Sequence, residues 1–170
     1  MDIKTNTCLS RFDNEKASKY LLITFIIIIN LIILYNTLFH FPFRGYDSYY
    51  HRLNIQIYPT SIPTPEESKE FFSAPLPYFI PSIVNRVCNS LGVEPNLSIR
   101  LAGKASQLIN FLFSVGISFL FWKITDKINP GNLKVKWIVY LNLGILTVFY
   151  RTFSQVRGEP YLTFFSVLLF

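Results

Sequence analysis

The chain has 170 residues, of which 51% are hydrophobic and 17% aromatic. Only 15% are charged, against about 25% in an ordinary soluble domain. The hydrophobic residues gather in long blocks with almost no charge, so the composition excludes an ordinary soluble domain and indicates a membrane protein. The net charge is +6, but the basic residues flank the apolar blocks and form no basic stripe, so no nucleic-acid partner is expected.

The first apolar block follows a polar N-terminal tail. Residues 1–19 carry charges of both signs, whereas residues 20–43 carry none. About 20 helical residues cross the hydrocarbon core of a bilayer. The tail is too long and too mixed in charge to begin a signal peptide, and no small-residue cleavage site follows the block. We therefore predict a tail over residues 1–19 and a first transmembrane helix over residues 20–43.

Residues 44–96 form a long polar interval that opens with an amphipathic pattern. Polar residues recur there with the period of a helix, at Asp47, His51, Asn54 and Tyr58. More apolar residues repeat the same spacing on another face. This pattern predicts a helix that lies flat along the membrane surface.

Two further short helices are predicted in the same interval. Residues 64–67 read Thr-Pro-Glu-Glu, which is a capping box with proline at the first helical position, so a helix is expected to run to about Phe72. Apolar residues at helical spacing over residues 80–91 mark the other helix, which Gly92 is expected to end.

The second half of the chain alternates apolar blocks with short polar breaks. We predict a second transmembrane helix over residues 97–124, capped by Asn96, and a third over residues 137–156. A lysine-rich loop, residues 125–136, separates them. Residues 157–170 begin a fourth helix that is too short to cross a bilayer, so the chain is expected to be the N-terminal fragment of a larger protein.

The two lysine-rich segments, residues 1–19 and 125–136, are separated by two predicted crossings. Short basic segments stay in the cytoplasm, so the charge rule and the crossing count agree. The long interval 44–96 and the break at residue 157 then share the opposite side. The predicted fold class is an all-α, multi-pass membrane protein with amphipathic interfacial helices in a long first outer loop.

Two acids, Asp47 and Glu159, are predicted to lie on that outer side, each at the end of an apolar block. Asp47 also suits a helix N-cap, and Glu159 suits the first turn of a helix, where the dipole favours an acid. His51 is four residues from Asp47 and fits an oriented base, a metal ligand or a phosphate contact, or an ordinary interfacial histidine. Tyr50 fits an aromatic belt. These alternatives stay open at the level of sequence.

Four short motifs together resemble the N-terminal part of the GT-C glycosyltransferases. They are Gly45–His51, Ala74–Tyr78, Leu97–Leu101 and Arg157–Pro160. This family comprises multi-spanning enzymes that use polyprenyl-phosphate sugars, such as the protein mannosyltransferases and the bacterial aminoarabinose transferases. Relatives often carry His-Pro-Pro where this chain has Ser-Ala-Pro at residues 73–75, so no acceptor or metal role is carried over from that position.

The resemblance implies transfer of a sugar from a polyprenyl-phosphate donor to an acceptor lipid, glycan or protein. The expected location is the outer face of a bacterial plasma membrane or, alternatively, the luminal face of the endoplasmic reticulum. Asp47 would act as the general base, supported by Glu159, and a divalent metal held by these acids and His51 is possible. The residues expected to bind substrate are His51, Tyr50, Arg100 and Arg157. The fragment alone is expected to be inactive.

Sugar transfer from a lipid phosphate needs a base for the acceptor and cations for the departing phosphate. If Asp47 and Glu159 serve one site, their carboxyls should approach within about 10 Å, with Arg157 or Arg100 beside them to offset the repulsion. The alternative is a non-enzymatic membrane protein, such as an assembly subunit or a transporter fragment. A transporter concentrates polar groups near the bilayer midplane, whereas these acids lie at the edge, which favours an interfacial enzyme.

Overall fold

The computed structural model describes residues 4–45, 47–58, 60–70 and 73–170. Within these ranges the chain forms helices and no strand, which confirms the all-α prediction. The helices are α1 (Lys4–Phe39), α2 (Ser48–Ile57), α3 (Leu76–Ser90), α4 (Pro95–Ile128), α5 (Leu133–Ile145), α6 (Thr147–Phe153) and α7 (Glu159–Leu168).

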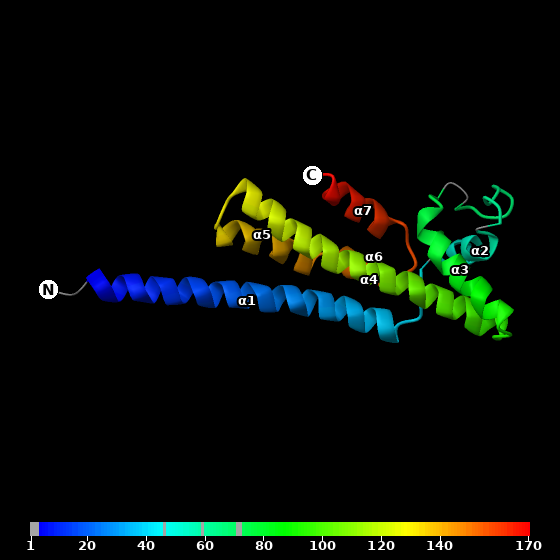
Figure 1. The fold of residues 1–170 in the computed structure, drawn as a ribbon, viewed down its shortest axis with the longest axis horizontal. Coiled ribbons are helices and arrows are strands. Elements are labelled where there is room, and N and C mark those ends of the chain that lie inside the picture. Colours follow the sequence, from blue (N-terminus) through cyan, green and yellow to red (C-terminus); the bar gives the residue numbers. More distant parts are fainter. Residues whose placement is uncertain (1–3, 46, 59, 71–72) are drawn as a thin grey trace.

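Two long rods, α1 and α4, run side by side and set the length of the molecule (Figure 1). Helices α5 and α6 pack against both rods, and α7 packs along α4. Helices α2 and α3 lie together at the end of the molecule where α4 begins. The polar interval of the sequence therefore forms a compact cap on one end of a helical bundle.

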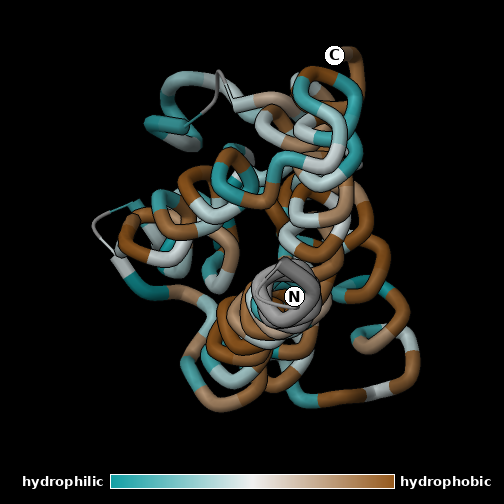
Figure 2. The backbone as a smooth tube through the Cα atoms, turned by 90° about the vertical axis from the view of Figure 1, so that its left-hand side faces the viewer, coloured by the Kyte–Doolittle hydropathy of each residue, from teal (hydrophilic) through white to brown (hydrophobic). Residues whose placement is uncertain are grey.

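Two helical segments are long and apolar enough to cross a membrane, Asn14–Phe39 and Pro95–Ile128. A third crossing is possible if α5 and α6 are counted as one span, although they meet at a bend of 68°. Figure 2 shows long hydrophobic stretches in the helices, with hydrophilic residues both on helical turns and in the connecting loops. The described residues thus contain two or three candidate spans.

The described part of the N-terminal tail is helical and continuous with the first apolar block. Residues 4–19 belong to α1, which continues to Phe39. No proline or glycine interrupts this stretch, so nothing breaks the helix where polar residues give way to apolar ones. The helix ends earlier than residue 43 because Pro42 disfavours helical backbone in the residue before it.

The cap of α4 also differs from the prediction. Glu94, and not Asn96, occupies the N-cap, and its carboxylate accepts hydrogen bonds from the backbone amides of Asn96 and Leu97, both at 3.1 Å. These bonds hold the pKa of Glu94 below its ordinary value. Pro95 fills the first helical position, where no amide proton is needed. At the other end only residues 129–132 lie outside a helix, so the predicted loop 125–136 is mostly helical.

Helix α2 forms where the amphipathic pattern predicted a helix, but its more polar face points inward. His51, Asn54 and Ile55 are buried, while Leu53 and Ile57 stay half-buried. Each polar side chain has one partner in a neighbouring element: His51 Nδ1 bonds with the Tyr78 hydroxyl, and Asn54 Nδ2 donates to the Glu70 carbonyl. The other polar atoms, His51 Nε2 and Asn54 Oδ1, are buried without a hydrogen bond among the described residues, so the burial is only partly compensated.

The helix predicted after Thr64 does not form. Described residues 61–70 make turns, although the Thr64 amide donates to Glu67 Oε2 at 2.9 Å, which is half of the capping box. Exposed residues surround this turn and offer no apolar face to bury, and a single isolated turn is not stable by itself. Residues 71 and 72, the expected end of that helix, lie outside the described residues.

The third apolar block is bent, and not a straight helix over residues 137–156. Leu146 has extended backbone between α5 and α6. The Tyr150 hydroxyl donates to the Gly144 carbonyl at 3.0 Å, which satisfies an acceptor at the helix end. The break turns α6 towards α1 and α4 and leads the chain to Arg157.

Two hydrophobic clusters hold these elements together. One joins α1, α4 and α6 along the rods, and the other joins α2, α3 and α4 in the cap. The cap cluster consists of Ile55, Tyr58, Tyr78, Ile99, Ala102 and Val156. Tyr78 of this cluster also lines a cavity together with Asp47 and Glu159.

Candidate functional site

Asp47 occupies the N-cap position of α2, yet its side chain makes no capping hydrogen bond. Its Oδ1 lies 3.1 Å from the Arg157 guanidinium, and its Oδ2 lies 3.3 Å from Nε2 of His51. Gly45 precedes it with a φ of +114°, a backbone conformation that glycine adopts far more readily than other residues. Helix capping therefore does not account for where the Asp47 carboxylate points.

Arg157 joins the two acids. One terminal nitrogen binds Asp47, and the other binds Glu159 Oε1 at 3.2 Å. The structure thus brings together two carboxylates from distant parts of the chain through one guanidinium. Glu159 also sits in the first turn of α7 and is more than half exposed, so the favourable helix dipole contributes to its position as well.

Two amide side chains of α4 position Arg157. Gln107 Nε2 donates to the Ser154 carbonyl at 2.6 Å, and Asn110 Nδ2 donates to the Gln155 carbonyl at 2.7 Å. Both amides are completely buried. The sequence signal for this role was two uncharged polar residues in an otherwise apolar span, which need a protein partner there; sequence reasoning did not place them at the site.

His51 is only 6% exposed and faces the acids. Its Nδ1 lies 2.7 Å from the Tyr78 hydroxyl. Its Nε2 is within ion-pair distance of Asp47 but is not aligned for a hydrogen bond with any described residue. One ring nitrogen is therefore engaged, and the other is buried beside the Asp47 carboxylate.

Tyr78 is a neighbour of His51 that the sequence did not single out. Its ring stacks on those of His51 and Tyr58 at centroid distances of 5.8 and 5.7 Å. Burial raises the pKa of Tyr78 to about 12, so its hydroxyl stays protonated. A hydroxyl can donate or accept, so the bond fits both neutral tautomers of His51: when the hydroxyl donates to Nδ1, the imidazole proton lies on Nε2, the atom that faces Asp47.

These groups line a cavity of about 590 Å³ between the cap and α7. Asp47, His51, Glu70 and Glu159 form its polar side. Leu162 belongs to its apolar side and is 72% exposed, and Leu76 and Phe165 there are also exposed. The cavity therefore combines acidic side chains with an edge of exposed apolar side chains.

Two predicted substrate-binding residues lie elsewhere. The Arg100 guanidinium sits over the ring of Phe41 at 5.8 Å, and the Tyr50 ring faces the Lys69 ammonium at 5.9 Å. In the part of the chain that the structure describes, neither side chain bonds to the acids. The site thus assembles Asp47, His51, Arg157 and Glu159, without Arg100 and Tyr50.

The acids do not form a metal site in this arrangement. Among the described residues, no group of three or more His, Cys, Asp or Glu side chains is placed to hold a metal ion. A guanidinium stands between Asp47 and Glu159. These residues do not fit the divalent metal that the resemblance allowed.

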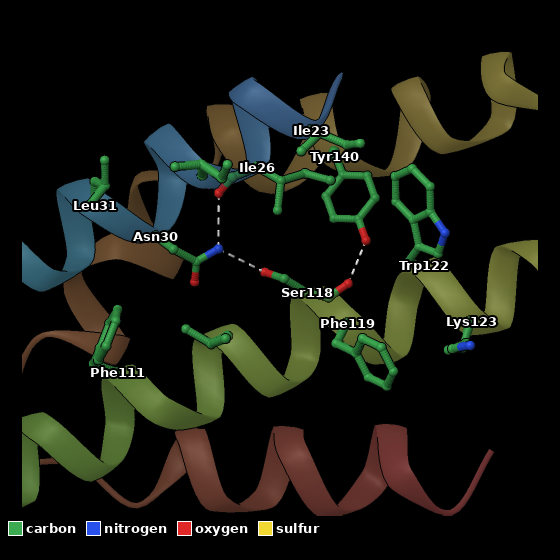
Figure 3. Close-up of a pocket in the computed structure, with 12 residues that line it drawn as sticks. Ile23, Ile26, Asn30, Leu31, Phe111, Ser118, Phe119, Trp122, Lys123 and Tyr140 are labelled. Atoms are coloured by element: carbon green, nitrogen blue, oxygen red, sulfur yellow. Dashed lines mark hydrogen bonds between the residues drawn. The ribbon is translucent and has the colours of Figure 1, made fainter. Parts of the chain in front are cut away.

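A second large cavity, of about 550 Å³, lies between α1, α4 and α5 (Figure 3). Asn30 Nδ2 donates to Ser118 Oγ at 3.1 Å and to the Ile26 carbonyl at 3.0 Å. The Tyr140 hydroxyl donates to the Ser118 carbonyl. These polar groups bind one another across three helices, so we assign them to helix packing and not to chemistry.

Comparison with known proteins adds no relative. No family model, no curated protein and no solved structure matches the chain.

Proposed function

We propose that the chain belongs to a membrane glycosyltransferase that takes its sugar from a polyprenyl-phosphate donor. The observation that carries this proposal is the cavity that combines two acids with an exposed apolar edge. A polyprenyl donor has a matching division, with a sugar phosphate at one end and a hydrocarbon chain at the other. The apolar edge would let the chain stay in lipid while the sugar reaches the acids.

Each polar group then has a role in the reaction. Asp47 would accept the proton of the attacking acceptor hydroxyl. Arg157 would offset the repulsion between the carboxylates and hold Asp47 in place. His51, oriented by the Tyr78 hydroxyl, would present Nε2–H beside Asp47 and steady the carboxylate during proton transfer.

The proposed setting is a multi-pass membrane protein with this cavity on the outer or luminal face. The two apolar rods, and α5–α6 as a bent third span, would cross the bilayer. The cap of α2 and α3 would then rest at the membrane surface. A bacterial plasma membrane is the proposed location, with the endoplasmic reticulum as the alternative.

One observation favours a different function. The chain of ion pairs from Glu159 through Arg157 to Asp47 also fastens α7 to the start of α2. A non-enzymatic assembly subunit or transporter fragment would use such a link only to hold its helices together. The two proposals differ in what removing the Asp47 charge does to activity.

The test replaces the native protein with an Asp47→Asn variant in the cells that normally produce it. Sugar transfer is then measured in membrane vesicles from these cells and from cells with the native protein. Labelled polyprenyl-phosphate mannose, glucose and arabinose serve as donors. We expect transfer from one of them to fall at least about 100-fold, as expected when a general base is lost, with unchanged protein abundance. Glu66→Gln, which alters an exposed loop acid, is the matched control and should change nothing. Full activity of Asp47→Asn would favour the purely structural link.

A further inference from the structure

A smaller cavity of different character is lined by Arg44, next to Gly45 in the chain. Its volume is about 240 Å³, and it lies between the C-terminal end of α1 and helix α6. His40, Arg44 and Arg151 line it, together with the polar side chains of Asn36, Ser154 and Gln155. Every titratable group that lines it is basic or a tyrosine, so the cavity attracts anions.

The two arginines of this cavity are available to a ligand. Arg44 and Arg151 are both exposed, and neither forms an ion pair with another described residue. Asp47, whose Oδ1 lies 3.4 Å from the Cβ position of Gly45, already binds Arg157. Arg157 and Arg100, the phosphate candidates from sequence, are engaged elsewhere.

The end of α1 would ordinarily weaken anion binding here, because the C-terminus of a helix carries unpaired carbonyls and partial negative charge. Lys104 of α4 removes this obstacle. Its ammonium donates to the carbonyls of Thr37 and His40, at 2.6 and 2.5 Å, and to that of Leu38 at 3.1 Å. The carbonyl end of α1 is thus occupied by a cation, and the arginines keep their full attraction for an anion.

The surroundings of the cavity are apolar and open. Phe41, which lines the cavity, is 43% exposed, and Leu146 and Val148, the neighbours in sequence of the lining residue Thr147, are exposed as well. Such side chains at the edge of a charged pocket suit a ligand whose charged head is attached to hydrocarbon. The surroundings therefore favour a lipid over free phosphate.

We propose that the cavity formed by His40, Arg44 and Arg151 binds the phosphate monoester headgroup of a membrane lipid. Arginine recognises phosphate through paired hydrogen bonds, and two guanidinium groups can share one phosphate. A Cβ atom on Gly45 would lie 3.7 Å from Arg151 and 3.4 Å from Asp47. Resting on the proposed function, the monoester would be the polyprenyl phosphate that is released when the sugar is transferred, bound beside Gly45 and so close to the proposed base.

The test is lipid binding to the purified chain in detergent, measured by native mass spectrometry. The probes are dioleoyl phosphatidic acid, which carries a phosphate monoester, and dioleoyl phosphatidylcholine, which carries none. We expect one phosphatidic acid to bind selectively. Each of Arg44→Gln and Arg151→Gln should weaken this binding about tenfold, the effect of losing a charged hydrogen-bond partner.

Arg100→Gln is the matched control, because it removes the same charge from the same end of the molecule outside the cavity. It should leave binding within about twofold. Arg44→Lys keeps the charge but loses the paired hydrogen bonds, so it should weaken binding less than Arg44→Gln. Circular dichroism checks that each variant keeps its helices.

Three results would overturn the proposal. These are equal binding of phosphatidylcholine, unchanged binding in both glutamine variants, or an equal loss in Arg100→Gln. Inorganic phosphate distinguishes the two sources of the headgroup: displacement of phosphatidic acid at an equal concentration would assign the cavity to free phosphate. None of these readouts uses sugar transfer, so the result is separate from that of the proposed reaction.

Discussion

Two clusters of charge in this molecule are built differently. At the turn between α4 and α5, Lys136 binds Asp126, and its ammonium lies 4.1 Å from the centroid of the Trp122 ring. This is one acid and one base, ten positions apart. At the other cluster, Asp47 and Glu159 share the single cation Arg157, which is 110 positions from Asp47.

The difference is consistent with packing alone at the first cluster and with the proposed function at the second. The Lys136–Asp126 pair has no net charge and links the ends of two neighbouring helices, so stabilisation of the turn between them is a sufficient explanation for it. Two acids around one arginine, with Glu70 lining the same cavity, leave an excess of negative charge that a fold does not need for stability. Stability should therefore respond differently when the cation of each cluster is removed.

The largest effect is expected from Arg157→Gln. The change leaves Asp47 and Glu159 facing each other without a cation, and we expect it to lower the free energy of unfolding by about 3 kcal/mol. Denaturant titration in detergent, followed by circular dichroism, measures it. Adding Glu159→Gln should restore part of the loss, because one of the repelling charges is gone. A double variant as unstable as the single one would show that charge excess is not the cause.

The second prediction concerns pH at the Asp47 cluster. Burial raises the pKa of Tyr78 to about 12, above the ordinary value near 10. The unfolded chain therefore loses this proton first, so the stabilisation is complete below about pH 10 and is lost as the pH rises towards about 12. Over that interval wild type should lose about 2 kcal/mol more than Tyr78→Phe.

Tyr78→Phe should also cost about 1 kcal/mol at neutral pH, because Nδ1 of His51 loses its partner. Unfolding at several pH values between about 8 and 12 gives both quantities. Parallel curves for the two proteins would mean that Tyr78 does not titrate differently in the folded state.

The third prediction compares two glycines with positive φ, one beside each charge cluster. Gly45 has a φ of +114° and lies against Asp47 and Arg157, whereas Gly131, at +71°, has no neighbour within 4 Å of its Cβ position. Gly45→Ala should cost about 2 kcal/mol and Gly131→Ala about 1 kcal/mol. Thermal unfolding of both variants measures the difference. A larger loss at Gly131 would contradict the close packing assigned to Gly45.

The smallest effect is expected at the balanced pair. Lys136 is only 5% exposed, but in Asp126→Asn the amide oxygen still accepts its hydrogen bond, and the Trp122 ring still faces its charge. We expect a loss of about 1 kcal/mol. Lys134→Gln, an exposed change on the same turn, should stay within about 0.5 kcal/mol. If Asp126→Asn lowered the free energy of unfolding as much as Arg157→Gln does, the two clusters would not differ in the way proposed.

The sequence by itself predicted much of the fold, because helix formation follows local spacing and composition. The apolar blocks gave the two long rods, and the amphipathic pattern after Asp47 gave α2. The predicted helix boundaries were wrong where the local sequence allowed more than one structure and tertiary contacts determined which one formed. A helix after Thr64 had a cap but no surface to bury, and the third block bent at Leu146, where the Tyr150 hydroxyl satisfies a freed carbonyl.

The candidate site was only partly visible in the sequence. Asp47, His51, Arg157 and Glu159 stood out as polar residues at the ends of apolar blocks, because such a signal is local. The tertiary structure determined which arginine binds the two acids. Two buried amides of α4 bind the backbone before Arg157 and deliver its guanidinium to Asp47, whereas Arg100 lies over an aromatic ring. Long-range hydrogen bonds leave no periodic trace in a sequence, so only the folded chain shows them.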